Sequence, residues 1–150
     1  MVLHQDFKEL LSLLDANTVD YMVIGAYALG FYGAPRNTGD IDIWIRVDAA
    51  NAKKIVKALD EFGLSSLGYK ESDFLEKDLV IQLGVPPVRI DIITGISGVK
   101  FDEAYLNKNS INKDGTKINY IGKEDFIKNK KASGRLKDLA DIESISSKIE

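Results

Sequence analysis

The most regular alternation of apolar and polar positions in the chain lies over residues 40–46. Isoleucine occupies every second position there, and charged residues or tryptophan occupy the positions between. A period of two predicts a β-strand that buries one face in the core and leaves the other for different contacts. Similar or shorter apolar runs predict strands at 21–24, 79–83, 88–93 and 117–121, with a hairpin-like connection between 79–83 and 88–93.

Apolar residues recur at helical spacing in several other segments. Asp48 is placed to cap the N-terminus of one of these helices, and Gly25 separates the first strand from the helix that follows it. Helices are expected at 3–14, 26–32, 49–62, 123–132 and 136–149. Because the strands are both separated by helices and joined directly, the pattern predicts an α/β (α+β) domain with a mixed central sheet flanked by helices.

No repeat or flexible linker divides the 150 residues, so we expect a single domain over 1–150 with a helical C-terminal segment at 123–150. The absence of cysteine excludes a disulfide scaffold, a cysteine nucleophile and thiolate zinc sites. No segment approaches the roughly 18 consecutive apolar residues of a membrane span, and the charge at Asp6 does not fit an apolar signal core. We therefore expect a cytoplasmic protein that contacts no membrane.

The net charge of −3 argues against a protein that holds nucleic acid chiefly by neutralising phosphates. The charges are also unevenly distributed. Residues 1–99 carry 9 basic and 14 acidic side chains, whereas residues 100–150 carry 11 basic and 9 acidic ones. An acidic body with a mildly basic C-terminal part can combine a cation site with an anion site.

Two carboxylates, Asp40 and Asp42, share the polar face of the strand at 40–46. Residues two apart project from one face about 6.6 Å from each other, given a rise near 3.3 Å per residue. Asp91 lies between isoleucines in a second strand, so three carboxylates converge if these strands are neighbours. Like charges there repel, and Mg²⁺, which prefers oxygen ligands, would remove that cost. The alternative is that Asp40 and Asp42 lie on the solvent face of an edge strand.

The segment before these carboxylates favours the metal site. Gly25 follows a buried strand and a helix begins at Ala26, so free backbone N–H groups and the positive end of the helix dipole are presented there. The segment Arg36-Asn37-Thr38-Gly39 then leads into the carboxylates. Together these features indicate a site that holds a triphosphate beside a metal ion.

These motifs resemble those of the polymerase-β-type nucleotidyltransferase superfamily over about residues 19–93. The segments that carry the resemblance are Gly25-Ala26-Tyr27-Ala28-Leu29, Arg36-Asn37-Thr38, Asp40-Ile41-Asp42-Ile43 and Ile90-Asp91-Ile92. Further along, Lys130, Arg135, Lys137 and Asp138 follow the spacing K-x4-R-x-K-D. That spacing resembles the branch that includes the AbiEii-like toxins of type IV toxin–antitoxin systems.

The resemblance implies a nucleotidyltransferase fold and transfer of a nucleoside monophosphate from an NTP to an acceptor hydroxyl, with release of pyrophosphate. Asp40 and Asp42 would bridge two Mg²⁺ (or Mn²⁺) ions, and Asp91 would hold the ion on the acceptor side and accept the hydroxyl proton. The residues implied to bind the nucleotide are Gly25, Ala26, Arg36, Thr38, Lys130 and Arg135. Arg36 would reach triphosphate oxygens and Thr38 would brace the turn before the strand; the alternative for both is a structural role in the loop. For Lys130 and Arg135 the alternative is a solvated basic face paired with Asp138 and Asp141.

One position departs from the superfamily. Members usually have Gly or Ser as the second residue of the phosphate-facing turn, whereas this chain has Ala26, which lacks a hydroxyl. Three interpretations stay open at this point. The protein is an enzyme that modifies RNA or protein, an enzyme that modifies a small molecule of the aminoglycoside or lincosamide type, or a catalytically silent module that binds an antitoxin or another protein partner.

Overall fold

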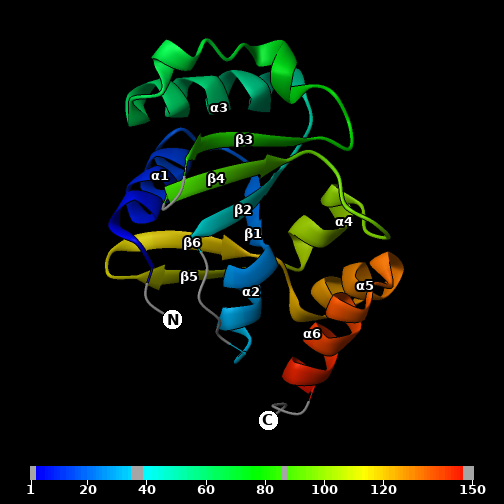
Figure 1. The fold of residues 1–150 in the computed structure, drawn as a ribbon. Helices are drawn as coiled ribbons and strands as arrows, with labels where there is room; N and C mark the ends of the chain where they lie inside the picture. The colour runs from blue at the N-terminus through cyan, green and yellow to red at the C-terminus, as the bar shows by residue number, and fades with distance from the viewer. Residues whose placement is uncertain (1–2, 35–38, 86–87, 147–150) are drawn as a thin grey trace.

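The computed structural model describes residues 3–34, 39–85 and 88–146. Within these residues, six strands form one mixed sheet in the order β3-β4-β2-β1-β6-β5 (Figure 1). The strands are β1 (Tyr21–Ile24), β2 (Asp40–Ile45), β3 (Val80–Val85), β4 (Val88–Ile93), β5 (Asn109–Lys113) and β6 (Thr116–Tyr120). The central strand β2 pairs antiparallel with β1 and parallel with β4.

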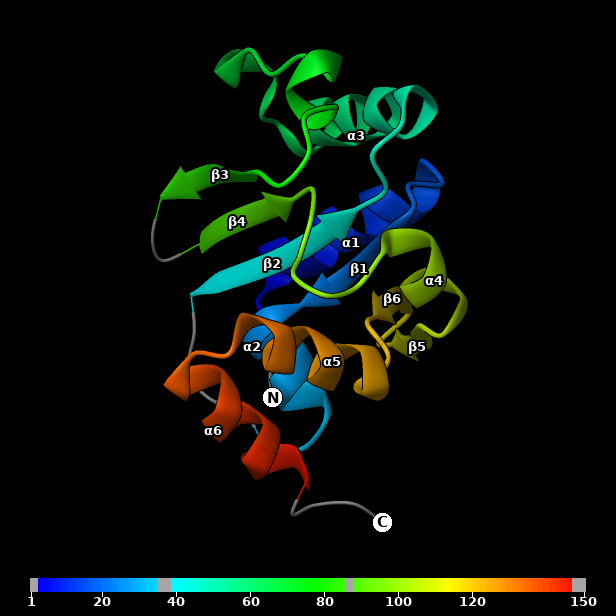
Figure 2. The same cartoon turned by 90° about the vertical axis from the view of Figure 1, so that its right-hand side faces the viewer.

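The helices cover both faces of this sheet. They are α1 (Gln5–Ala16), α2 (Gly25–Phe31), α3 (Ala49–Phe62), α4 (Phe101–Leu106), α5 (Lys123–Ser133) and α6 (Leu136–Ser146). Helix α1 packs against α3 and β6. In Figure 2, α1 lies behind the strands while α4 and α5 lie in front of them, with α2 next to α5.

The alternation along β2 assigns its two faces to different surroundings. Ile41, Ile43 and Ile45 are almost completely buried and belong to the main core. That core also contains the apolar stripe of α1, which consists of Phe7, Leu10, Leu11 and Leu14. Asp40 and Asp42 point from the opposite face and are only partly buried. On that face only Trp44, two residues beyond Asp42, is fully buried, so the acidic part of the face lies at the edge of the core.

The structure confirms the predicted fold class and most of the predicted elements. Asp48 caps α3 by accepting a hydrogen bond from the backbone N–H of Asn51, as the sequence predicts. Helix α4 and strand β5 were not predicted, nor were the 3₁₀ turns Ser65–Leu67 and Glu71–Phe74. Strand β5 has no apolar alternation because it lies at the edge of the sheet and its residues are largely exposed. None of the helices in the described part of the chain is long and apolar enough to cross a membrane.

Candidate active site

The parallel pairing of β2 and β4 brings the predicted acidic residues together. Asp42 lies directly opposite Asp91, and Asp40 lies opposite Arg89. Neighbouring strands in register project paired residues from the same face, so the three carboxylates share one side of the sheet. Asp91 is 6% exposed and the Asp40 side chain is 35% exposed, so the group extends from the interior to the surface. The sequence predicts that the three carboxylates converge if their strands are neighbours, and the fold meets that condition.

Gly25 closes the site from the side of β1. It follows the last residue of that strand, Ile24, which pairs with Asp42. Its φ of +68° is in the left-handed region, and a Cβ atom at this position would overlap the Asp42 carboxylate. Glycine is therefore required both by the backbone conformation and by the close approach of the carboxylate.

Helix α2 begins at Gly25, so Ala26 lies in its first turn. No side chain caps this helix end, since its N-cap residue is Ile24. Tyr27, in the same turn, packs edge-on against Phe7, and burial, followed by the charge of Asp40, raises the pKa of its hydroxyl. The start of α2 is thus next to the acidic residues, where the sequence places the phosphate-facing turn.

The surroundings of Asp42 oppose its ionisation. Burial, followed by the charge of Asp91, raises the pKa of Asp42 to about 6. A carboxyl group behaves in this way when it is desolvated beside a like charge, because its charged form is then disfavoured. A cation placed between Asp42 and Asp91 would reverse that effect.

Arg89 supplies a cation to this group of carboxylates. Its Nε and Nη2 atoms donate to the two oxygens of Asp91, each at 3.1 Å. Its Nη2 atom also lies 2.6 Å from Oδ2 of Asp40. This role was not predicted from the sequence. The signal was present, because Arg89 lies two residues before Asp91 and must share its face of the strand.

The donor set of the site fits a divalent ion. Three carboxylates on one face offer the oxygen ligands that Mg²⁺ and Mn²⁺ prefer, and Gly25 leaves no side chain beside Asp42. As the side chains stand, however, no group of three or more acidic, histidine or cysteine residues in the described ranges is arranged to hold a metal ion. The carboxylates are instead bridged by Arg89.

The other predicted nucleotide-binding residues divide into two groups. Arg36 and Thr38 lie outside the described residues. Lys130 and Arg135 form a second cluster around Asp138, which is completely buried. Lys130 Nζ lies 3.3 Å from Oδ1 of Asp138, and Arg135 Nε lies 2.7 Å from its Oδ2. The hydrogen bonds from Arg135, and then Lys130, lower the pKa of Asp138 to about 2.

A cavity of about 570 Å³ lies further along the same strand. Its wall includes Trp44, Arg46, Thr94, Ile96, Val99 and Phe101. Trp44 comes two residues after Asp42 and shares its face of the strand, but Asp40, Asp42 and Asp91 are not among the residues that line the cavity. A volume of this size is typical of small-molecule sites.

Solved structures with this fold include proteins named as nucleotidyltransferases. A candidate nucleotidyltransferase of Thermotoga maritima is 17% identical, with a TM-score of 0.59 over 95% of this chain and 91% of its own. The lincomycin-bound lincosamide antibiotic adenylyltransferase LnuA is 19% identical, with a TM-score of 0.56 over 97% and 98%. An antigenic nucleotidyltransferase-like protein of Paracoccidioides brasiliensis is 20% identical, with a TM-score of 0.52 over 95% and 77%. At these identities the likeness shows a shared fold.

The comparison with curated proteins gives no match. A family model described as "Nucleotidyl transferase of unknown function (DUF2204)" matches residues 3–150. This span includes the three carboxylates, Gly25 and the cluster around Asp138. The chain therefore belongs to the DUF2204 family of nucleotidyltransferases.

Proposed function

We propose that this protein is a metal-dependent nucleotidyltransferase that moves a nucleoside monophosphate from an NTP to an acceptor hydroxyl. The observation that carries the proposal is the register of β2 and β4, which sets Asp42 opposite Asp91 with Asp40 on the same face. Membership of a nucleotidyltransferase family supports this role for the carboxylates.

In this proposal Asp40 and Asp42 share one role and Asp91 has another. Asp40 and Asp42 direct their oxygens to the side of the sheet where the triphosphate would lie, and Asp91 accepts the proton of the acceptor hydroxyl. The bound Mg²⁺ or Mn²⁺ ions would neutralise the charge that develops on the phosphate and lower the pKa of the hydroxyl. Gly25 keeps the wall beside Asp42 free of a side chain.

The triphosphate would contact the first turn of α2 through the backbone of Gly25 and Ala26, where the backbone N–H groups have no partner within the helix. Ala26 therefore reduces the contacts of this turn without removing them. Arg135 is 70% exposed at its side chain while it pairs with Asp138, so it keeps donors for a phosphate oxygen. Lys130, Arg36 and Thr38 complete the proposed nucleotide-binding set.

The acceptor we favour is a small molecule. The 570 Å³ cavity supports this choice, since its volume suits a small molecule and Trp44 in its wall lies two residues along β2 from Asp42. An aminoglycoside or lincosamide has the required hydroxyl groups and size. RNA and protein are the competing acceptors, and the net charge of −3 disfavours RNA.

The test is to incubate the protein with Mg²⁺ and each labelled NTP, offering aminoglycosides, lincosamides, total RNA and protein lysate as acceptors. We expect label in a small-molecule product, loss of the product with EDTA, and no product with Asp42→Asn. Glu9→Gln, which removes an exposed carboxylate on α1, is the matched control and should transfer normally. A lack of product in every combination would instead support a silent module with an antitoxin or other protein partner, as in the AbiEii-like systems.

A further inference from the structure

Arg89 occupies the position among the carboxylates where a cation is needed. We propose that it is a built-in counter-cation that competes with a divalent ion for Asp40 and Asp91, so that the ion binds only when the guanidinium swings away. This inference rests on the proposed role of these carboxylates as ion ligands. It adds a control step to that site, since the resting form would be closed by a residue of the chain itself.

The contacts of Arg89 use the oxygens that an ion would need. The guanidinium donates to both oxygens of Asp91 at 3.1 Å and reaches Oδ2 of Asp40 at 2.6 Å. A fork of N–H donors facing a carboxylate in this way is the strong form of an arginine ion pair. An ion at these oxygens would compete with the guanidinium for their lone pairs and would be repelled by its positive charge.

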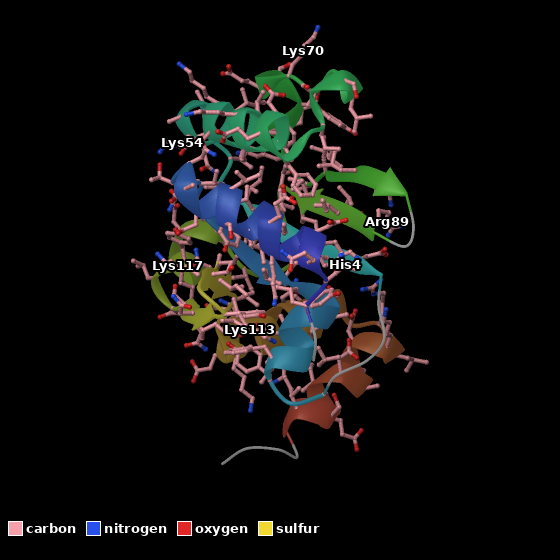
Figure 3. The ribbon with its side chains drawn as sticks, turned by 90° about the vertical axis from the view of Figure 1, so that its left-hand side faces the viewer. His4, Lys54, Lys70, Arg89, Lys113 and Lys117 are labelled. Carbon is pink, nitrogen blue, oxygen red and sulfur yellow. The ribbon has the colours of Figure 1, made fainter. Side chains whose placement is uncertain are left out.

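The position of Arg89 also leaves room for the side chain to move. The residue paired with it on β3 is Gly84, which presents no side chain beside it. The Arg89 side chain is 28% exposed, and Figure 3 shows it at the outer end of the β3–β4 pair. A rotation about its side-chain bonds would take the guanidinium into solvent without disturbing the core residues of β4.

Competition of this kind weakens the apparent affinity for an ion by the fraction of molecules that are open. If the bridge is closed in about nine molecules of ten, the apparent affinity falls about tenfold. Removing the guanidinium should restore that affinity. A residue that merely positions the carboxylates for the ion would have the opposite effect when it is removed.

The experiment is a titration of the metal-free protein with Mn²⁺, followed by electron paramagnetic resonance of the free ion. Arg89→Gln should bind Mn²⁺ about tenfold more tightly than the parent. Lys117→Gln removes the same charge from β6, on the other side of the molecule in Figure 3, and should bind as the parent does. Equal or weaker binding by Arg89→Gln, or an equal gain by Lys117→Gln, would overturn the proposal.

A second measurement uses the parent itself and does not depend on whether the variant folds. In the NMR spectrum, the Nε–H proton of Arg89 should exchange slowly with water in the metal-free protein and rapidly when Mg²⁺ is added. Exchange that is unchanged by Mg²⁺ would contradict the swing. Nucleotide transfer is measured separately, so a parent that transfers nothing while Arg89→Gln gains the ion refutes the enzyme and keeps this inference. If the parent transfers label but Arg89→Gln binds the ion no more tightly, the enzyme is supported and this inference is refuted.

Discussion

Gly25 touches the carboxylate of Asp42 so closely that the two positions cannot both carry ordinary side chains. The contact joins the end of β1 to the acidic face of β2, and it makes the shape of the proposed phosphate site depend on a single missing Cβ atom. The effect of restoring that atom can be separated from the effect of backbone strain.

Gly25→Ala should destabilise the protein by more than the backbone conformation alone accounts for. Gly68 has a similar φ of +73°, but no atom lies within 4 Å of the place that its Cβ would occupy. Gly68→Ala should therefore cost only about 1 kcal/mol for the left-handed backbone. Gly25→Ala should cost about 1–3 kcal/mol beyond that, since the added methyl displaces Asp42. Chemical denaturation of both variants gives the comparison.

The same collision can be tested by coupling. Asp42→Ala removes the overlapping carboxylate, so Gly25→Ala made in that background should cost little more than Gly68→Ala does. An unchanged cost in the double variant would show that the carboxylate is not what Gly25 accommodates.

Asp42→Asn should leave the metal-free protein as stable as the parent, or more stable. The reason is that Asp42 is desolvated and repelled by Asp91, and an amide of the same shape removes the repulsion. The variant should lose the rise in melting temperature that Mg²⁺ with NTP gives the parent. Four melting curves measure this, with Glu9→Gln as control. A variant that melts lower yet keeps the full ligand-dependent rise would end the catalytic assignment of Asp42.

Asp138→Asn should destabilise the protein in a pH-dependent manner. The pKa of Asp138 is lowered to about 2 in the fold, so its charge stabilises the native state above the unfolded pKa near 4, and this contribution is lost as the pH falls through about 2. The parent should exceed the variant by about 2 kcal/mol between pH 5 and 7. Denaturation from pH 7 to pH 2 should show the difference shrinking below about pH 4. A difference that stays constant would mean that shape, and not charge, is what Asp138 supplies.

Arg135→Ala should leave the fold intact and weaken the binding of Mg²⁺ with NTP by about tenfold, the effect of one charge-assisted contact to phosphate. Asp138 would keep its contact with Lys130, so the loss of stability should be no more than about 1 kcal/mol. Calorimetry and melting curves measure the two effects. Lys131→Ala, which removes a neighbouring exposed cation, is the control. If both variants bind equally well, Arg135 has only the structural role of holding Asp138.

The sequence predicts features that depend on residues close together in the chain better than features that depend on distant residues. The alternation along β2 and the Asp48 cap of α3 are set by residues close in the chain, and the structure has both. Strand order is set by packing over the whole chain, so the convergence of Asp42 with Asp91 could be stated only as a condition. The contact of Arg89 with Asp40 depends likewise on the register of β2 and β4, whereas its contact with Asp91, two residues along the same strand, could have been predicted.

Two omissions have local causes. Helix α4 has only six residues, too few for a periodic stripe. Strand β5 is polar, but the turn that joins it to β6 has both Asp114 and Gly115 at positive φ. An Asp-Gly pair is a common hairpin signal, and it could have revealed β5.

The role of Asn51 was also missed, and its cause is not local. Asn51 is buried in α3 and forms hydrogen bonds with the backbone of Asp20 and Arg46, and helical periodicity does not show such tertiary contacts.

Substitutions on the two faces of β2 should affect the stability of the protein differently. Ile41 and Ile43 are fully buried in the core. Asp42 instead bears a charge that burial and the neighbouring Asp91 disfavour, so the fold does not depend on it. A descendant of this protein could therefore exchange its acidic residues and remain a well-folded, long-lived domain. Such a domain would keep the surfaces through which it meets other molecules. The proposed activity and the stability of the fold would thus be separable at a single position of one strand.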